Sequence, residues 1–180
     1  MRHILLFFSI LSAGAANAGC PAPVDIAVAE GRLLKEAQSL PDNSQANRIS
    51  QELWALWATA PDAKAQEMLD RGMAARATYD FDTAIEAFDA LVAYCPDYAE
   101  GYNQRAFVNF LRQDYETALT DLEEAIIRSP RHVAAISGKA LTLMGLGRQD
   151  EAQATLLEAL KLNPWIPERN YLVEAPGTDL

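Results

Sequence analysis

The sequence predicts an all-α fold, a solenoid of three helical hairpins, because its markers recur with one fixed period. Three prolines lie 34 residues apart, at Pro96, Pro130 and Pro164, and a period of this length is typical of stacked structural repeats. The same register holds for small residues at the eighth and twentieth places of each block and for a large apolar residue at the twenty-fourth. These residues are Gly72, Ala106 and Ala140; Ala84, Ala118 and Ala152; and Phe88, Leu122 and Leu156.

Each of these places has a physical role in a helical hairpin. Two antiparallel helices approach closely only where the facing side chains are small, which the eighth and twentieth places provide. The bulky residue at the twenty-fourth place fills the space beside that contact, and the proline stops the second helix. Alanine at the twenty-seventh place, Ala125 and Ala159, lets the next hairpin pack close. Leu91 at the same place predicts a slightly wider spacing after the first hairpin.

Three segments of these blocks resemble the tetratricopeptide-repeat family: Tyr102-Asn-Gln-Arg-Ala106, Asp114-Tyr-Glu-Thr-Ala118 and Glu158-Ala-Leu-Lys-Leu-Asn-Pro164. The resemblance extends over residues 65–164. It implies a right-handed α-solenoid with repeats at 65–98, 99–132 and 133–166.

The turn inside each hairpin departs from the family pattern in two of the three repeats. The fifteenth place, often glycine in the family, is Gly147 in the third repeat but Tyr79 and Gln113 in the first two. We therefore expect another residue of those two turns to adopt the unusual backbone angles.

Residues on both sides of the repeats are expected to cap them. Upstream, residues 24–40 and 44–60 predict two helices, which form a degenerate hairpin within 19–64 that shields the first repeat. Downstream, residues 166–173 predict a short helix over the last repeat, in a cap and tail at 167–180. Solenoid ends need such caps because an unstacked repeat leaves an apolar face exposed.

The first eighteen residues have the pattern of a signal peptide. Arg2 gives a positive start, the run from Ile4 to Leu11 is apolar, and Ala16-Asn17-Ala18 is a small-x-small cleavage site. The apolar run is shorter than the roughly 20 residues that span a bilayer, which disfavours a membrane anchor. Cleavage after Ala18 predicts a periplasmic protein.

A lipid anchor is the alternative location. Ala18-Gly19-Cys20 resembles the end of a bacterial lipoprotein box, in which the cysteine is acylated, although Asn17 stands where that box usually has an apolar residue. We favour ordinary cleavage, and with it a disulfide between Cys20 and Cys95, because an exported chain meets oxidising conditions. A buried free thiol at Cys95 and lipidation of Cys20 are the competing hypotheses.

Catalysis is not predicted. His132 is the only histidine after the first eighteen residues, and its place after Pro130 suggests a solvated turn. One histidine and two cysteines do not make a typical zinc site, so we expect no catalytic residue, no metal and no cofactor. A net charge of −10 repels phosphate backbones and therefore disfavours nucleic acid as a partner.

The predicted function is protein binding. In the family, the first helix of each hairpin lines a concave surface through its second, fifth, ninth and twelfth places, with bases at the seventh place usually solvated or paired with acids. An alternative interpretation assigns some apolar side chains of this stripe to the core between the helices. The partner-binding groove is predicted to contain Met73, Arg76, Asn103, Gln104, Phe107, Phe110, Leu141 and Met144.

The composition of this stripe favours an apolar or amphipathic segment of another protein as the partner. The family's carboxylate clamp, made of lysines and arginines, is absent from it. Our leading hypothesis is a periplasmic scaffold. The alternatives are a lipoprotein of the outer membrane that assists envelope assembly and, more remotely, an enzyme of an unrecognised kind.

Overall fold

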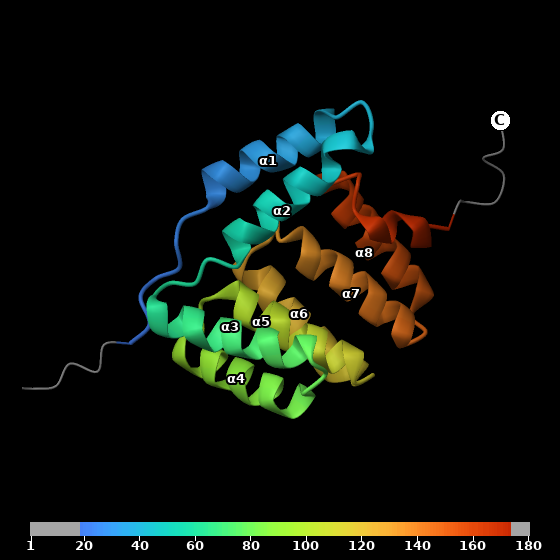
Figure 1. Ribbon diagram of the computed structural model, residues 1–180. Coiled ribbons are helices and arrows are strands. Elements are labelled where there is room, and N and C mark those ends of the chain that lie inside the picture. Colours follow the sequence, from blue (N-terminus) through green and yellow to red (C-terminus); the bar gives the residue numbers. More distant parts are fainter. Residues whose placement is uncertain (1–18, 174–180) are drawn as a thin grey trace, which may run out of the picture.

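The computed structural model describes residues 19–173, which fold into eight α-helices and two 3₁₀-helices (Figure 1). Within these residues no helix combines the length and the apolar character that a membrane span requires. The elements are α1 (Ala27–Ser39), η1 (Asn43–Gln45), α2 (Ala46–Trp57), α3 (Ala63–Ala77), α4 (Phe81–Tyr94), α5 (Ala99–Leu111), α6 (Tyr115–Arg128), α7 (Val133–Gly145), α8 (Gln149–Leu162) and η2 (Pro167–Tyr171).

The hairpins α3–α4, α5–α6 and α7–α8 are the three predicted repeats, and the all-α solenoid is confirmed. The first helix begins at Ala63, two residues before the expected boundary. The residues at the small places are buried, and a Cβ added to Gly72 would lie only 2.4 Å from the ring of Phe88. Close helix crossing therefore depends on these residues. Between the second and third repeats, Ala125 packs with Ala135. Between the first and second repeats, Leu91 faces Gly101, so the larger residue is matched by a glycine.

The expectation that another residue would replace glycine in the first two turns is wrong. Tyr79 and Gln113 themselves have positive φ angles, 62° and 63°, close to the 74° of Gly147. Both side chains are exposed, so neither turn adds a steric clash to the intrinsic cost of this conformation. The helix that follows each turn is capped by an aspartate, because Asp80 and Asp114 accept hydrogen bonds from the backbone N–H groups of Thr83 and Thr117.

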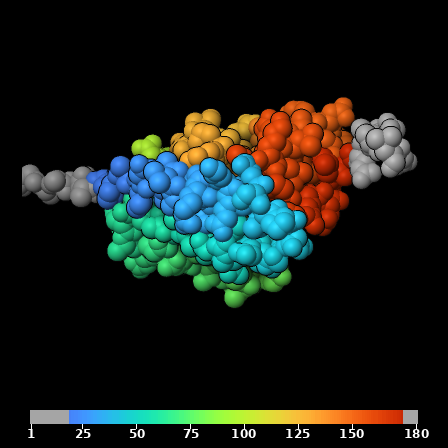
Figure 2. Space-filling view, turned by 90° about the horizontal axis from the view of Figure 1, so that it is seen from above, coloured from blue at the N-terminus to red at the C-terminus, as the bar shows by residue number. Residues whose placement is uncertain are grey.

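The N-terminal hairpin α1–α2 does not shield the first repeat, which corrects our expectation. It packs against the outer face of the third repeat. Figure 2 shows it lying against the orange and red part of the chain. Leu33, Leu34 and Ala37 of α1 and Ile49, Leu53 and Trp57 of α2 share one buried cluster with side chains of α7 and α8. These partners are Val133, Ile136, Ala140, Leu156 and Ala159.

Polar contacts fix the hairpin at both ends. On the third repeat, the indole N–H of Trp165 donates to the carbonyl of Ala37 at 2.9 Å. At the opposite end of α2, the hydroxyl of Tyr98 donates to the carbonyl of Trp57 at 2.7 Å. Thus α2 runs along the edge of the solenoid from the third repeat to the first, as Figure 1 shows. The predicted C-terminal helix is the 3₁₀-helix η2, which follows the buried Ile166.

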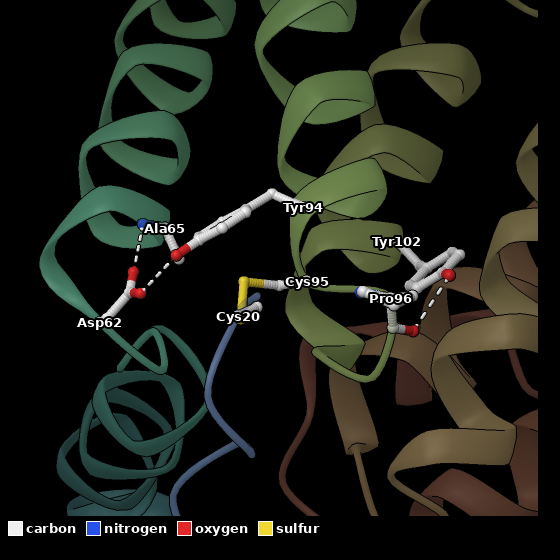
Figure 3. Close-up of a disulfide and its surroundings, with 7 residues drawn as sticks. All are labelled: Cys20, Asp62, Ala65, Tyr94, Cys95, Pro96 and Tyr102. Atoms are coloured by element: carbon white, nitrogen blue, oxygen red, sulfur yellow. Dashed lines mark hydrogen bonds between the residues drawn. A yellow bond between two sulfur atoms is a disulfide. The ribbon is translucent and has the colours of Figure 1, made fainter. Parts of the chain in front are cut away.

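A disulfide joins Cys20, before α1, to Cys95, at the end of α4, with their Cα atoms 5.1 Å apart (Figure 3). This is the pairing that the sequence predicts. Beside it, Asp62 accepts the backbone N–H of Ala65 at 2.8 Å and the hydroxyl of Tyr94 at 2.7 Å. The disulfide therefore ties the N-terminal segment covalently to the first repeat, while the hydrogen bonds of Asp62 join the start of α3 to α4.

The substitution Ala118→Leu should lower the free energy of unfolding by about 1 to 3 kcal/mol, because it forces bulk into a fully buried helix crossing. Urea unfolding followed by circular dichroism measures the change. Ala154→Leu, at an exposed position of α8, is the matched control and should change stability little. Equal stability of the two variants would contradict the repeat register.

Candidate binding groove

A groove of about 330 Å³ lies across the first helices of the three repeats, α3, α5 and α7. It is mostly apolar, and its size is within the usual range of ligand pockets. Six of the eight residues predicted from the sequence line this groove: Arg76, Asn103, Gln104, Phe107, Phe110 and Leu141.

The spacing of residues along α5 explains why they meet in the groove. Asn103, Phe107 and Phe110 are separated by four and then three residues, which places them on one stripe of the helix. Phe107 is 43% exposed although it is a large aromatic residue. Phe110 is half-buried, and its ring lies 5.5 Å from that of Tyr115. The floor of the groove is therefore aromatic and accessible.

The other two predicted residues, Met73 and Met144, do not line the groove. Met73 packs against the core of the first repeat, and Met144 packs against core clusters of the third. The repeat pattern places both on the correct helices, but flexible methionine side chains fill gaps in the core instead.

Two residues outside the repeats complete the groove and were not predicted as part of it. Trp54 of α2 and Glu168 of η2 lie in its lining. The neighbouring apolar residues of α2 include Ile49, Leu53 and Trp57. Those three residues are buried, but Trp54 is 46% exposed and also lines an adjoining pocket. Neither residue has a local signal for this role, because both reach the groove through long-range packing.

Arg76 is the cation of the groove. Its guanidinium lies over the ring of Phe107, 4.6 Å from the centroid, a cation–π arrangement. Burial lowers the pKa of Arg76, an effect that the nearby charge of Glu100 partly offsets. Among residues 19–173, no carboxylate lies within ion-pairing distance of Arg76.

Arg105 and Lys139 stand at the seventh place of the second and third repeats, and both are paired with acids, unlike Arg76. Arg105 contacts Asp89 and Asp121, each at 2.7 Å, and Lys139 contacts Glu123 at 3.0 Å. The paired acids lie on the second helices of the repeats. This arrangement agrees with the structural role expected for these bases.

Behind the groove, the buried carboxylate of Glu100 organises the polar side chains. It accepts hydrogen bonds from the side-chain amides of Asn103 at 3.0 Å and Gln104 at 2.5 Å. Because both amides direct their NH₂ groups toward Glu100, their carbonyl oxygens are left for other donors. The oxygen of Gln104 is buried without a partner within the part of the chain that the structure describes.

His132 is buried, not solvated as the sequence suggested. It is 1% exposed and stacks on Trp57 with the ring centroids 4.1 Å apart. Its Nδ1 accepts the backbone N–H of Ala135 and caps α7, so Nε2 carries the proton and donates to Glu100 at 2.8 Å. The sequence could not show this role because Trp57 is far from His132 along the chain. Both ring nitrogens are engaged in structural hydrogen bonds.

Comparison with known proteins gives one family. Residues 110–165 match the family model described as tetratricopeptide repeat. The chain is 30% identical over 106 residues to a TPR repeat-containing protein of Rhizobium etli, which covers 59% of this chain and 52% of that protein. It is 34% identical over 119 residues to tetratricopeptide repeat protein 36 of Xenopus tropicalis, covering 63% and 58%. The chain thus spans about half the length of these curated relatives.

A solved structure shares the fold. The first TPR of Spaghetti (RPAP3), bound to the HSP90 peptide SRMEEVD, superposes with a TM-score of 0.59 at 22% identity. The match covers 61% of this chain and 87% of the other.

Proposed function

Because this chain is a tetratricopeptide-repeat protein, we propose that it is a non-catalytic scaffold that binds a segment of another protein in the groove across α3, α5 and α7. The fold itself suggests protein–protein interaction. The observation that carries the proposal is Phe107, which lies half-exposed on the floor of a groove with Arg76 against its ring. Aromatic residues at the centre of a concave surface are typical anchors of protein interfaces.

A solved relative supports a peptide as the bound species. The RPAP3 domain binds a peptide of another protein, and this complex is direct evidence for RPAP3 alone. The groove of the present chain offers an aromatic floor, the amide carbonyl of Asn103 and one arginine. These groups suit an amphipathic segment better than a highly charged one.

We place this scaffold in the periplasm. The signal-peptide pattern lies in residues 1–18, outside the described part of the chain. Support comes from the pairing of Cys20 with Cys95, because disulfides persist in oxidising compartments. A lipoprotein of the outer membrane that assists envelope assembly is the alternative, and it needs the same sulfur of Cys20 for the lipid.

The mass of the intact protein from its native envelope tests this location. A chain that begins at Gly19 and lacks two hydrogens supports the periplasmic scaffold. A chain that begins at Cys20 with diacylglycerol and acyl mass would replace it by the lipoprotein.

The double variant Asn103→Ala, Phe107→Ala tests the binding role. It should retain helicity, since both side chains are partly exposed, but should capture less of the natural partner from native envelope extracts. Leu157→Ala on α8 is the control, because Leu157 is 46% exposed and lies outside the groove. Mass spectrometry of the captured proteins compares the three. Equal capture by all three proteins would move the binding site elsewhere.

A further inference from the structure

We propose that the bound segment has an extended apolar centre with an acidic residue at one end and a basic residue at the other. The acidic residue lies against Arg76 on the first repeat, and the basic residue lies against Glu168 beside the third. This inference rests on the proposed function and adds the chemical class and direction of the partner.

The acidic end follows from the environment of Arg76. Its guanidinium is half-buried in the groove lining, with no carboxylate partner among the described residues. A partly buried charge without an ion pair loses hydration that nothing fully replaces. Phe107 supplies a cation–π contact, and the charge of Glu100 acts on Arg76 from beyond ion-pairing distance. A carboxylate from the partner would provide the direct ion pair that Arg76 lacks among the described residues.

The basic end follows from Glu168. This side chain is half-buried in the same groove lining, and no cation of residues 19–173 forms an ion pair with it. It belongs to η2, which follows α8 of the third repeat, whereas Arg76 belongs to α3 of the first. Arg76 and Glu168 therefore enter the groove lining from the first repeat and from the segment after the third, and a segment that crosses the repeats meets them in a fixed order.

The middle of the groove favours an extended segment. Phe107, Phe110 and Leu141 accept apolar side chains, and Trp54 adds a wall from outside the repeats. Asn103 is half-buried, and its amide donates to Glu100, so its carbonyl oxygen is available for a donor. An extended segment has free backbone N–H groups to offer, whereas those of a helix are mostly used internally.

Selection from random peptides displayed on phage tests the inference without knowledge of the natural partner. Wild-type protein should enrich peptides with an acid, an apolar run and a base in one order. A synthetic peptide of this pattern, capped at both ends, then gives dissociation constants. Arg76→Glu should weaken its binding by about tenfold or more and should restore binding to the version whose acid is replaced by lysine.

Matched variants separate this inference from general electrostatics. Arg71→Glu makes the same change of charge at an exposed position of α3 and should leave binding unchanged. Glu168→Lys should likewise weaken binding of the peptide and should restore binding to the version whose base is replaced by glutamate. Glu158→Lys on α8 is its control. Because Arg76 and Glu168 lie on different elements, failure of one variant to fold leaves the other as a test.

The outcomes also distinguish this inference from the proposed function. Peptides that are apolar without charge preference, and that bind less tightly to Phe107→Ala, would overturn the charge assignment and leave the groove as the binding site. Peptides whose binding is unchanged in Phe107→Ala, or a failure to select any peptide, would overturn both proposals. A charge swap that restores binding at both ends supports both.

Discussion

Replacing Cys20 and Cys95 by alanine is expected to lower the free energy of unfolding by about 4 kcal/mol. The disulfide joins residues 75 positions apart, so it restricts a long loop of the unfolded chain, and the chain-entropy estimate for such a loop is of this size. The loop contains the hairpin α1–α2, which packs on the third repeat. Loss of the bridge therefore weakens the attachment of this hairpin as well.

Urea unfolding followed by circular dichroism measures this effect. Wild-type protein in a strong thiol reductant should unfold at the same midpoint as the double alanine variant, because both lack the bridge. The oxidised wild-type protein should unfold at a clearly higher midpoint. Identical midpoints for oxidised and reduced protein would show that the bridge adds nothing to stability.

Glu100→Ala should have the second largest effect, a loss of about 3 kcal/mol. The carboxylate is 1% exposed and accepts from Asn103, Gln104 and His132. Its removal leaves buried donors without an acceptor, which costs more than the hydrogen bonds themselves contribute. It also frees the two amides, so peptide binding in the groove should weaken in the same variant.

Glu123→Ala is the matched control for this change. Glu123 is exposed on α6, and its one ion pair among residues 19–173 is with Lys139, so its loss should cost well under about 1 kcal/mol. Thermal unfolding by calorimetry compares the two variants with the wild type. If Glu100→Ala and Glu123→Ala melted alike, the buried network would have no structural role.

The repeats could be predicted from the sequence because their signals are local and periodic. Gly72, Ala118 and Pro130 each have a role that depends only on neighbouring turns and on the next hairpin. The turns at Tyr79 and Gln113 show the limit of such rules. A preference for glycine is a modest energy difference, and packing of the flanking helices overcomes it at exposed positions.

The position of the N-terminal hairpin could not be predicted, because it depends on contacts far apart in the sequence. Amphipathic spacing shows that α1 and α2 bury one face, but it does not show which repeat covers that face. Ala37 and Trp165 are 128 residues apart. The buried state of His132 and the place of Trp54 in the groove both follow from this packing, so neither had a local signal.

Within the candidate groove too, local periodicity predicted which helix face a residue occupies, but not the contacts that depend on the whole fold. Asn103, Phe107 and Phe110 lie on one stripe of one helix, and the helical period was enough to place them together. Met73 and Met144 satisfy the same period, but flexible side chains turned them toward the core. Glu168 lies in a 3₁₀-helix whose position is set by the fold as a whole.

The place of the N-terminal hairpin has a consequence for how such an array evolves. Repeat proteins commonly lengthen by duplication of a hairpin at one end. Here α1 and α2 already cover Leu156 and Ala159, the face on which a fourth hairpin would stack. A hairpin added by duplication after α8 would have to displace the N-terminal hairpin, and the groove would then lose Trp54 from its lining. The number of repeats is therefore limited by a segment that precedes them.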